Sequence, residues 1–292
     1  MTAADFAQVA AGGLLMGLVY ALIAAGLSLI FGLMDVVNFA HGELLMLAMY
    51  AAFLLDRLFG LDPLPATPLI ALFLFAIGFL LYRALIARAL SVSVNRGMVQ
   101  IFVTFGLAIF LRGAAQYAFG TEFRSIPHAL LANHTLRLGP LFLPWPELAA
   151  GMIALLAFLL LFGVLRSEFG RALEATREDR EAVALIGIDR EWIFAVGFGL
   201  GTAAVGAAGA ALVSFYYVSP DVGANFALIA YITVALGGFG SLLGALIAGL
   251  LIGEVEAFTA FLLAPSLKQV GMFVLYVAVL AFRPNGLFGR RE

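Results

Sequence analysis

The chain has 292 residues, of which 64% are hydrophobic and only 12% are charged. Because soluble domains carry roughly 25% charged residues, this composition excludes a globule whose whole surface faces water. The formal net charge of -2 at pH 7 does not indicate a basic surface that would bind nucleic acid. The absence of cysteine excludes disulfides, thiolate metal sites and cysteine nucleophiles.

Apolar runs of about 20 residues, the length that crosses a bilayer as a helix, recur along the whole sequence. They predict an all-α polytopic membrane protein with about eight or nine transmembrane helices, in a single transmembrane domain over residues 1–292. The run at 226–240 is short and rich in glycine at its end, so a re-entrant half-helix fits it as well as a span. The expected helices cover residues 6–33, 36–55, 68–90, 99–120, 147–165, 193–217, 226–240, 241–263 and 268–282.

Arginine sets the expected orientation, because cytoplasmic loops between spans are enriched in Lys and Arg. Clusters of arginine lie at or after the C-terminal ends of the third, fifth and ninth expected helices. Placing all of them inside requires the N-terminus outside and the C-terminus in the cytoplasm, with the loop at 121–146 outside. The clusters are Arg83, Arg88 and Arg96; Arg166, Arg171, Arg177, Arg180 and Arg190; and Arg283, Arg290 and Arg291.

Polar side chains crowd the start of the second expected helix, where Asn38, His41 and Glu43 follow one another closely. Asn38 and His41 are three residues apart and share a helix face, whereas Glu43 points elsewhere. Such groups are costly at membrane depth and face protein or a watery cavity rather than lipid. Two interpretations remain open: these residues brace the backbone where a helix is broken, or they line the path of a solute.

Two further carboxylates, Glu254 and Glu256, lie inside the apolar run at 250–263. Being two residues apart, they cannot both face one partner. We prefer a structural explanation, in which one of them pairs with Lys268 at the start of the next helix, over substrate or proton handling.

The sequence contains no recognisable catalytic motif. Its sole lysine, Lys268, is not part of a glycine-rich phosphate loop, and its three histidines form no zinc-binding His-Glu-x-x-His pair. We therefore expect no enzyme activity, no cofactor and no metal in this chain. The Gly-x-x-x-Gly pairs at 13–17 and 249–253 predict close helix packing rather than a nucleotide site.

The loop at 166–192 has a helical pattern of charged and apolar residues, and Gly187 is well placed to end that helix. A solvated connector between two spans is one interpretation. Because the chain has no energy source of its own, an apolar stripe on a short cytoplasmic helix also fits a plug that docks into a partner's groove. The stripe includes Ala182, Val183, Leu185 and Ile186.

Several motifs resemble one known family, the permease subunits of bacterial ABC importers for branched-chain amino acids. The N-terminal signature is the most specific: it reads GLVYALIAAGLSLIFG at 17–32 and VNFAHGE at 37–43. Asp35 departs from the family pattern, which has a small residue there. Further similarities are VALGGFGS at 234–241, FRPNGLFG at 282–289, and the cytoplasmic segments at 170–172, 180–182 and 186–188.

The resemblance implies an ABC importer permease fold in the bacterial inner membrane, with ATP hydrolysis on separate subunits. The implied partners are a related permease subunit that completes a heterodimer, two cytoplasmic ATPase subunits and a periplasmic substrate-binding protein. The form of the cytoplasmic loop is similar to the segment by which importer permeases touch their ATPases. The implied contact residues are Arg180, Glu181, Ala182, Val183, Ile186 and Gly187.

The same resemblance implies that branched-chain amino acids are translocated, while urea or another small polar solute stays open. A secondary transporter is the alternative from a different class. It would couple transport to an ion through His41, Glu43, Glu254 or Glu256 and would work without an ATPase.

Overall fold

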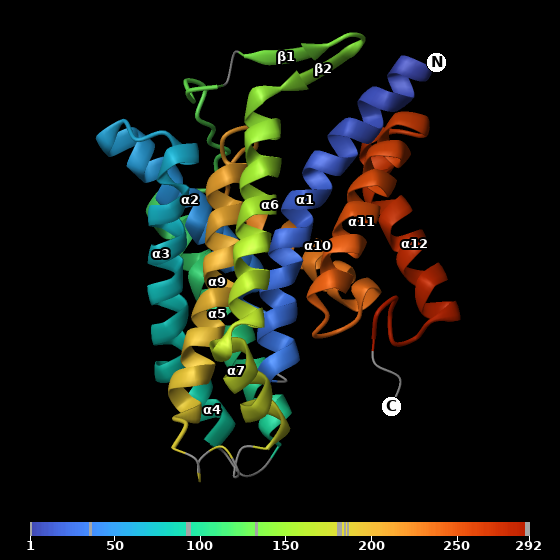
Figure 1. The fold of residues 1–292 in the computed structure, drawn as a ribbon. Helices are drawn as coiled ribbons and strands as arrows, with labels where there is room; N and C mark the ends of the chain where they lie inside the picture. Colours follow the sequence, from blue (N-terminus) through green and yellow to red (C-terminus); the bar gives the residue numbers. More distant parts are fainter. Residues whose placement is uncertain are drawn as a thin grey trace.

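Helices make up most of the protein, as the computed structural model in Figure 1 shows. The structure describes residues 2–34, 37–91, 95–131, 134–179, 183, 185 and 187–289. Its helices are α1 (Ala3–Met34), α2 (His41–Phe59), α3 (Pro63–Leu81), α4 (Ala87–Ser91), α5 (Arg96–Phe119), α6 (Trp145–Arg166), α7 (Glu168–Glu178), α9 (Arg190–Leu212), α10 (Val222–Gly237), α11 (Leu242–Leu262) and α12 (Lys268–Phe282). A π-helical turn at Tyr82–Ile86 joins α3 to α4, a 3-10 turn at Pro265–Leu267 precedes α12, and strands β1 (Thr135–Leu138) and β2 (Leu141–Pro144) form an antiparallel hairpin.

Each of the nine expected apolar ranges corresponds to a helix, which confirms the all-α prediction. Seven helices in the described part of the chain are long and apolar enough to cross a membrane, close to the eight or nine expected. The two that fall short are α2, which carries Glu43, Asp56 and Arg57, and α10, which has 16 residues. At 1.5 Å per residue α10 is about 24 Å long, less than the roughly 30 Å of a hydrocarbon core.

Local sequence sets where several helices begin. The Asp62 carboxylate accepts a hydrogen bond from Leu64 N at 3.0 Å, and Pro63 occupies the first turn of α3. In the same way Asp189 caps α9, and the Ser241 hydroxyl accepts from Gly244 N at the start of α11. These side chains satisfy N–H groups that the first helical turn leaves without a partner.

The centre of the bundle is built from α1 and α9, whose side chains are mostly buried, whereas few side chains of α5 and α12 are buried. α1 packs along α11, and α9 packs along α3. α9 is rich in Gly and Ala, which allows neighbouring helices to approach it from several sides.

Glycines form the contact between α1 and α11, as the two Gly-x-x-x-Gly pairs predict. A Cβ added to Gly253 would lie 2.6 Å from the Gly17 Cα, and one added to Gly249 would lie 2.6 Å from the Ala21 Cα. Both contacts are with backbone, which cannot move aside as a flexible side chain can. Only glycine therefore allows this separation between the helices.

The segment after α12 closes the end of α10. Leu287 N donates to Leu236 O at 2.8 Å, and Phe288 N donates to Gly237 O at 3.0 Å. Those two carbonyls lie in the last turn of α10, where no further helical N–H can reach them. The C-terminal motif thus supplies donors that a short helix in an apolar environment requires.

The two ends of the bundle differ in what they carry. Figure 1 shows the N-terminus and the β1–β2 hairpin at one end, and α4 and α7 at the other. Residues 121–131 and the hairpin form most of the first end. The second end carries the basic side chains of Arg83, Arg88, Arg171, Arg177 and Arg190.

We predict that Gly253→Ala destabilises the protein by about 1–3 kcal/mol, the usual cost of overpacking. The matched control is Gly12→Ala on α1, because a Cβ at Gly12 meets nothing within 4 Å. Thermal unfolding in detergent should show a lower Tm for Gly253→Ala and an unchanged or higher Tm for Gly12→Ala, since alanine favours helix. Equal Tm values for the two variants would contradict the close α1–α11 contact.

Candidate functional site

α2 begins deep inside the bundle rather than at its surface. The His41 Nε2 lies 2.9 Å from the carbonyl oxygen of Ile23 on α1, and Ile23 is eleven residues before the last residue of that helix, Met34. At 1.5 Å per residue, α2 therefore starts about 16 Å from the end of α1. Because a carbonyl oxygen can only accept, the Nε2 of His41 carries the proton and donates to it.

Asn38 shapes the turn that leads into α2. Its side-chain Oδ1 accepts from Ala40 N at 3.1 Å, and its main-chain oxygen accepts from His41 N at 3.1 Å and from the Tyr231 hydroxyl at 2.6 Å. Tyr231 belongs to α10, so this turn joins the start of α2 to a helix far along the chain. Asn38 and His41 are both fully buried, so neither side chain faces lipid.

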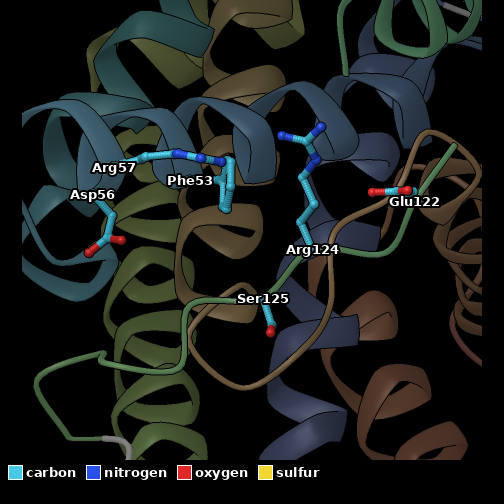
Figure 2. A pocket seen from close by; sticks show the side chains of 6 residues that line it. All are labelled: Phe53, Asp56, Arg57, Glu122, Arg124 and Ser125. Carbon is cyan, nitrogen blue, oxygen red and sulfur yellow. The ribbon is translucent and has the colours of Figure 1, made fainter. Parts of the chain in front are cut away.

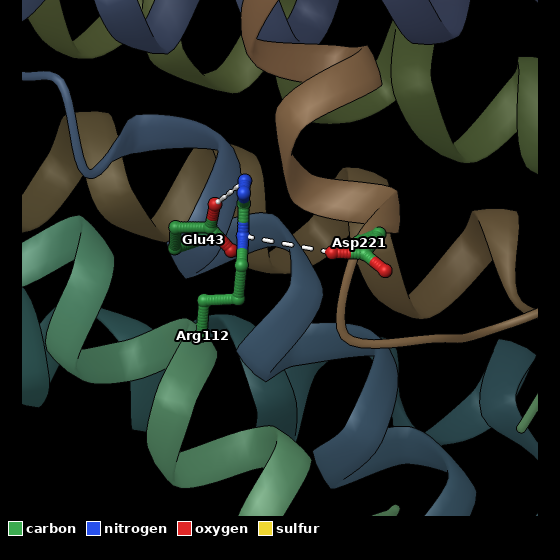
Figure 3. A network of polar contacts seen from close by, with 3 residues as sticks. All are labelled: Glu43, Arg112 and Asp221. Carbon is green, nitrogen blue, oxygen red and sulfur yellow. Dashed lines mark hydrogen bonds and ion pairs between the residues drawn. The ribbon is translucent and has the colours of Figure 1, made fainter. Parts of the chain in front are cut away.

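Glu43 points to another side of α2 and meets a basic residue, as Figure 3 shows. Its Oε1 lies 2.7 Å from Nη2 of Arg112 on α5, and Arg112 Nε lies 3.9 Å from Oδ1 of Asp221, the residue before α10. The Glu43 side chain is 5% exposed, against 36% for Arg112 and 67% for Asp221. The network therefore runs from the interior to an open face of the bundle.

Arg112 and Asp221 were not predicted from the sequence. Arg112 lies within the apolar run at 99–120, about 10 Å from the end of α5, and an ionisable side chain at that depth is by itself a sign of function. That signal was present in the sequence. Its pairing with Glu43 was not, because the two residues are 69 positions apart.

A charged cavity of about 470 Å³ lies at the end of the bundle that carries the hairpin, and Figure 2 shows its lining. The guanidinium carbons of Arg57 and Arg124 lie 5.9 and 5.7 Å from the centroid of the Phe53 ring. Asp56 and Glu122 also line the cavity. Within the described part of the chain, none of these four charged side chains forms an ion pair with an N···O distance of 4.0 Å or less.

At the opposite end, α7 packs through buried Gly170, Leu173 and Thr176. Beyond it, Val183 is buried and Leu185 is 88% exposed. Gly187 has a φ of +83°, the left-handed conformation expected of a residue that ends a helix. Four of the expected ATPase contacts, Arg180, Glu181, Ala182 and Ile186, lie outside the described residues.

Of the two carboxylates on α11, Glu256 is the one that pairs with lysine. Its Oε1 lies 3.0 Å from Lys268 Nζ, which confirms that one of the two glutamates pairs with Lys268. No group of three or more His, Cys, Asp or Glu that could hold a metal ion occurs among the described residues.

Comparison with known proteins identifies the class to which this bundle belongs. Residues 9–280 match the family model described as the permease component of branched-chain amino acid transport systems. The chain belongs to that family, and it is a multi-pass membrane permease.

Its relatives include two proteins of similar length, BraD and LivH, and a longer one, LivM. BraD of Pseudomonas aeruginosa, a high-affinity branched-chain amino acid transport system permease protein, is 33% identical over 98% of this chain and 97% of BraD. LivH of Salmonella typhimurium, which carries the same description, is 30% identical over 98% of this chain and 96% of LivH. LivM of the same organism, also described as a permease protein, is 28% identical over 93% of this chain and 68% of LivM.

We predict that Arg112→Leu destabilises the protein by about 1–3 kcal/mol, because it leaves the Glu43 carboxylate buried without its cation. This value lies below the cost of breaking a fully buried pair, since Arg112 is partly exposed. The double variant Glu43→Leu/Arg112→Leu should recover most of the lost Tm. Additive losses in a double-mutant cycle would show instead that the two side chains act independently.

Proposed function

We propose that this chain is one of two related permease subunits of an ATP-driven importer for branched-chain amino acids. The observation that carries the proposal is the family match over residues 9–280, because it includes all or most of every candidate membrane helix. BraD and LivH are described as high-affinity branched-chain amino acid permease proteins, which supports these substrates. Similarity to both LivH and LivM supports a partner of related sequence. The whole chain would act as one transmembrane domain.

We place the hairpin end in the periplasm and the α4 and α7 end in the cytoplasm of a bacterial inner membrane. The arginine clusters after α3, around α7 and after α12 support this orientation by the positive-inside rule. The N-terminus is then outside and the C-terminus inside. A periplasmic binding protein would dock at the outer end, where Arg57 and Arg124 are available to its carboxylates.

The face that exposes Arg112, Asp221 and Asn225 is the proposed meeting point with the partner permease and the wall of the translocation path. Charged and amide side chains at this depth are unsuited to lipid. α10 exposes Ala224, Asn225 and Leu228 on the same side, and a helix too short to cross the bilayer requires protein around it.

Within this arrangement Asn38 and His41 would brace the start of α2 against α10 and α1. Glu43 would hold Arg112 at the wall of the path. A change in that wall between inward-open and outward-open states would then be driven by ATP turnover on the partner subunits.

For energy coupling, we propose that the segment at 180–187 docks into a cytoplasmic ATPase. Leu185 supplies exposed apolar area, while the nearby charged residues, Arg180 and Glu181, would bond at the rim. Ala182 and Ile186 complete the proposed contact set, whereas Val183, also expected there, is buried within this chain. Gly187 turns the chain back toward α9 in a conformation that glycine adopts without strain.

The function is tested by reconstituting the purified complex of both permeases and both ATPases in liposomes, with the binding protein added. ATP should drive uptake of radiolabelled leucine, isoleucine and valine, and ATPase variants that bind but do not hydrolyse ATP should abolish it. Uptake driven by an ion gradient without the ATPases would contradict the proposal in favour of a secondary transporter. Uptake of urea with no amino acid uptake would contradict the substrate assignment.

We predict that Gly187→Val weakens ATPase attachment and lowers ATP-coupled uptake at least about tenfold, because a β-branched residue is strained at positive φ. Gly60→Val is the matched control, since Gly60 has a φ of +64° at the outer end of α2 and is equally open. It should retain the ATPases during purification.

The chain contains no cysteine, so single cysteines report on this docking without background. Leu185→Cys should form crosslinks to an ATPase subunit, whereas Leu138→Cys on the exposed hairpin should not. Normal coupled uptake by Gly187→Val together with no crosslink from position 185 would return the loop to the role of a solvated connector.

A further inference from the structure

A second polar cavity lies beside the proposed path, near the outer end of the bundle. It has a volume of about 270 Å³ and is lined by α1, the segment after α9, α10 and the start of α12. Its polar lining includes Tyr216, Tyr217, Asn225, Lys268 and Gln269. Asn225 comes four residues after Asp221 and so lies on the same side of α10 as the network of Arg112.

Lys268, a cationic residue that lines this cavity, is held in place by a buried carboxylate. The Lys268 ammonium lies 3.0 Å from Glu256 Oε1, and the Tyr20 hydroxyl donates to Glu256 Oε2 at 2.5 Å. Glu256 is 6% exposed and Tyr20 is 1% exposed, whereas the Lys268 side chain is 41% exposed. The carboxylate is thus enclosed in protein, while Lys268 is partly exposed and lines the cavity. Its ammonium has three N–H groups, more than one ion pair requires.

The rest of the wall combines aromatic surface with oxygen acceptors. The rings of Tyr216 and Tyr217 stack at a centroid distance of 4.5 Å, and Phe226 meets Tyr216 edge-on at 5.4 Å. Ile229 adds an aliphatic side chain. The two phenolic oxygens and the amides of Asn225 and Gln269 can accept hydrogen bonds from an ammonium group.

We propose that this cavity is a transit site for the translocated amino acid within the permease itself. Lys268 binds the α-carboxylate, the tyrosine and amide oxygens receive the α-ammonium group, and Phe226 and Ile229 contact the aliphatic side chain. A single site of this kind matches all three parts of a zwitterionic, aliphatic amino acid. The inference rests on the proposed function and adds selectivity in this chain, beyond that of the binding protein.

The test measures binding of radiolabelled leucine to the permease–ATPase complex in phosphatidylcholine nanodiscs without the binding protein. Lys268→Gln should weaken leucine binding about tenfold, the effect of losing one charge-assisted hydrogen bond. It should also remove the preference for leucine over leucinamide, which has no carboxylate. Glu256→Gln breaks the same ion pair but keeps the ammonium, so the preference for leucine should remain.

A second pair of variants keeps the test independent of the ion pair. Ile229→Ala should shift the preference from valine toward bulkier amino acids. Ile247→Ala on α11 is the matched control, because Ile247 is exposed and does not line the cavity. An unchanged order of preference in Ile229→Ala would overturn the assignment of Phe226 and Ile229.

Three results would overturn the transit site. Equal loss of leucine preference in Lys268→Gln and Glu256→Gln would assign the pair a structural role only. Loss of copurifying phosphatidylethanolamine in Lys268→Gln, with leucine binding unchanged, would assign the cavity to a lipid headgroup. Absence of leucine binding to a complex that still imports leucine would remove the site and leave the proposed function standing. Absence of ATP-driven amino acid uptake would instead remove the proposed function.

Discussion

The start of α2 inside the bundle is the constraint on which the surrounding structure depends. A chain that leaves helical conformation at this depth carries main-chain groups that lipid cannot satisfy. Here Asn38 closes the turn through its own side chain, Tyr231 donates to its main-chain oxygen, and His41 bonds to α1. The turn before α2 therefore holds α1, α2 and α10 together. It also fixes the depth in the bundle at which the Glu43 side chain lies.

The need to give buried polar groups partners also explains the surroundings of α10. It is too short to cross the bilayer, and residues far away in sequence contact both of its ends. Asp221 at its start approaches Arg112 of α5, and the segment after α12 donates to the carbonyls of its last turn. The glycine contacts between α1 and α11 keep this arrangement compact, because close backbone approach replaces the hydrophobic effect as the source of packing energy in lipid.

The polar side chains that remain are not spread evenly. They gather around α10, in the Glu43–Arg112–Asp221 network and in the Lys268 cavity. In both places an enclosed carboxylate holds a partly exposed cation in position. Two cations fixed in this way at the edge of a proposed path give it an electrostatic character suited to a solute that carries a carboxylate.

The sequence by itself determined the all-α class, the apolar ranges, the glycine pairs and the family, because these depend on composition and on short motifs such as the one at 37–43. It also identified Lys268 as a partner for one of two glutamates, since the three residues lie close along the chain. Only the tertiary structure decided that Glu256 is that glutamate, that Arg112 meets Glu43, and that Tyr231 meets Asn38. The last two contacts join residues 69 and 193 positions apart. Hydrophobic periodicity specifies which face of a helix is buried but not which distant helix covers it, so partners of this kind become visible only when the helices are packed.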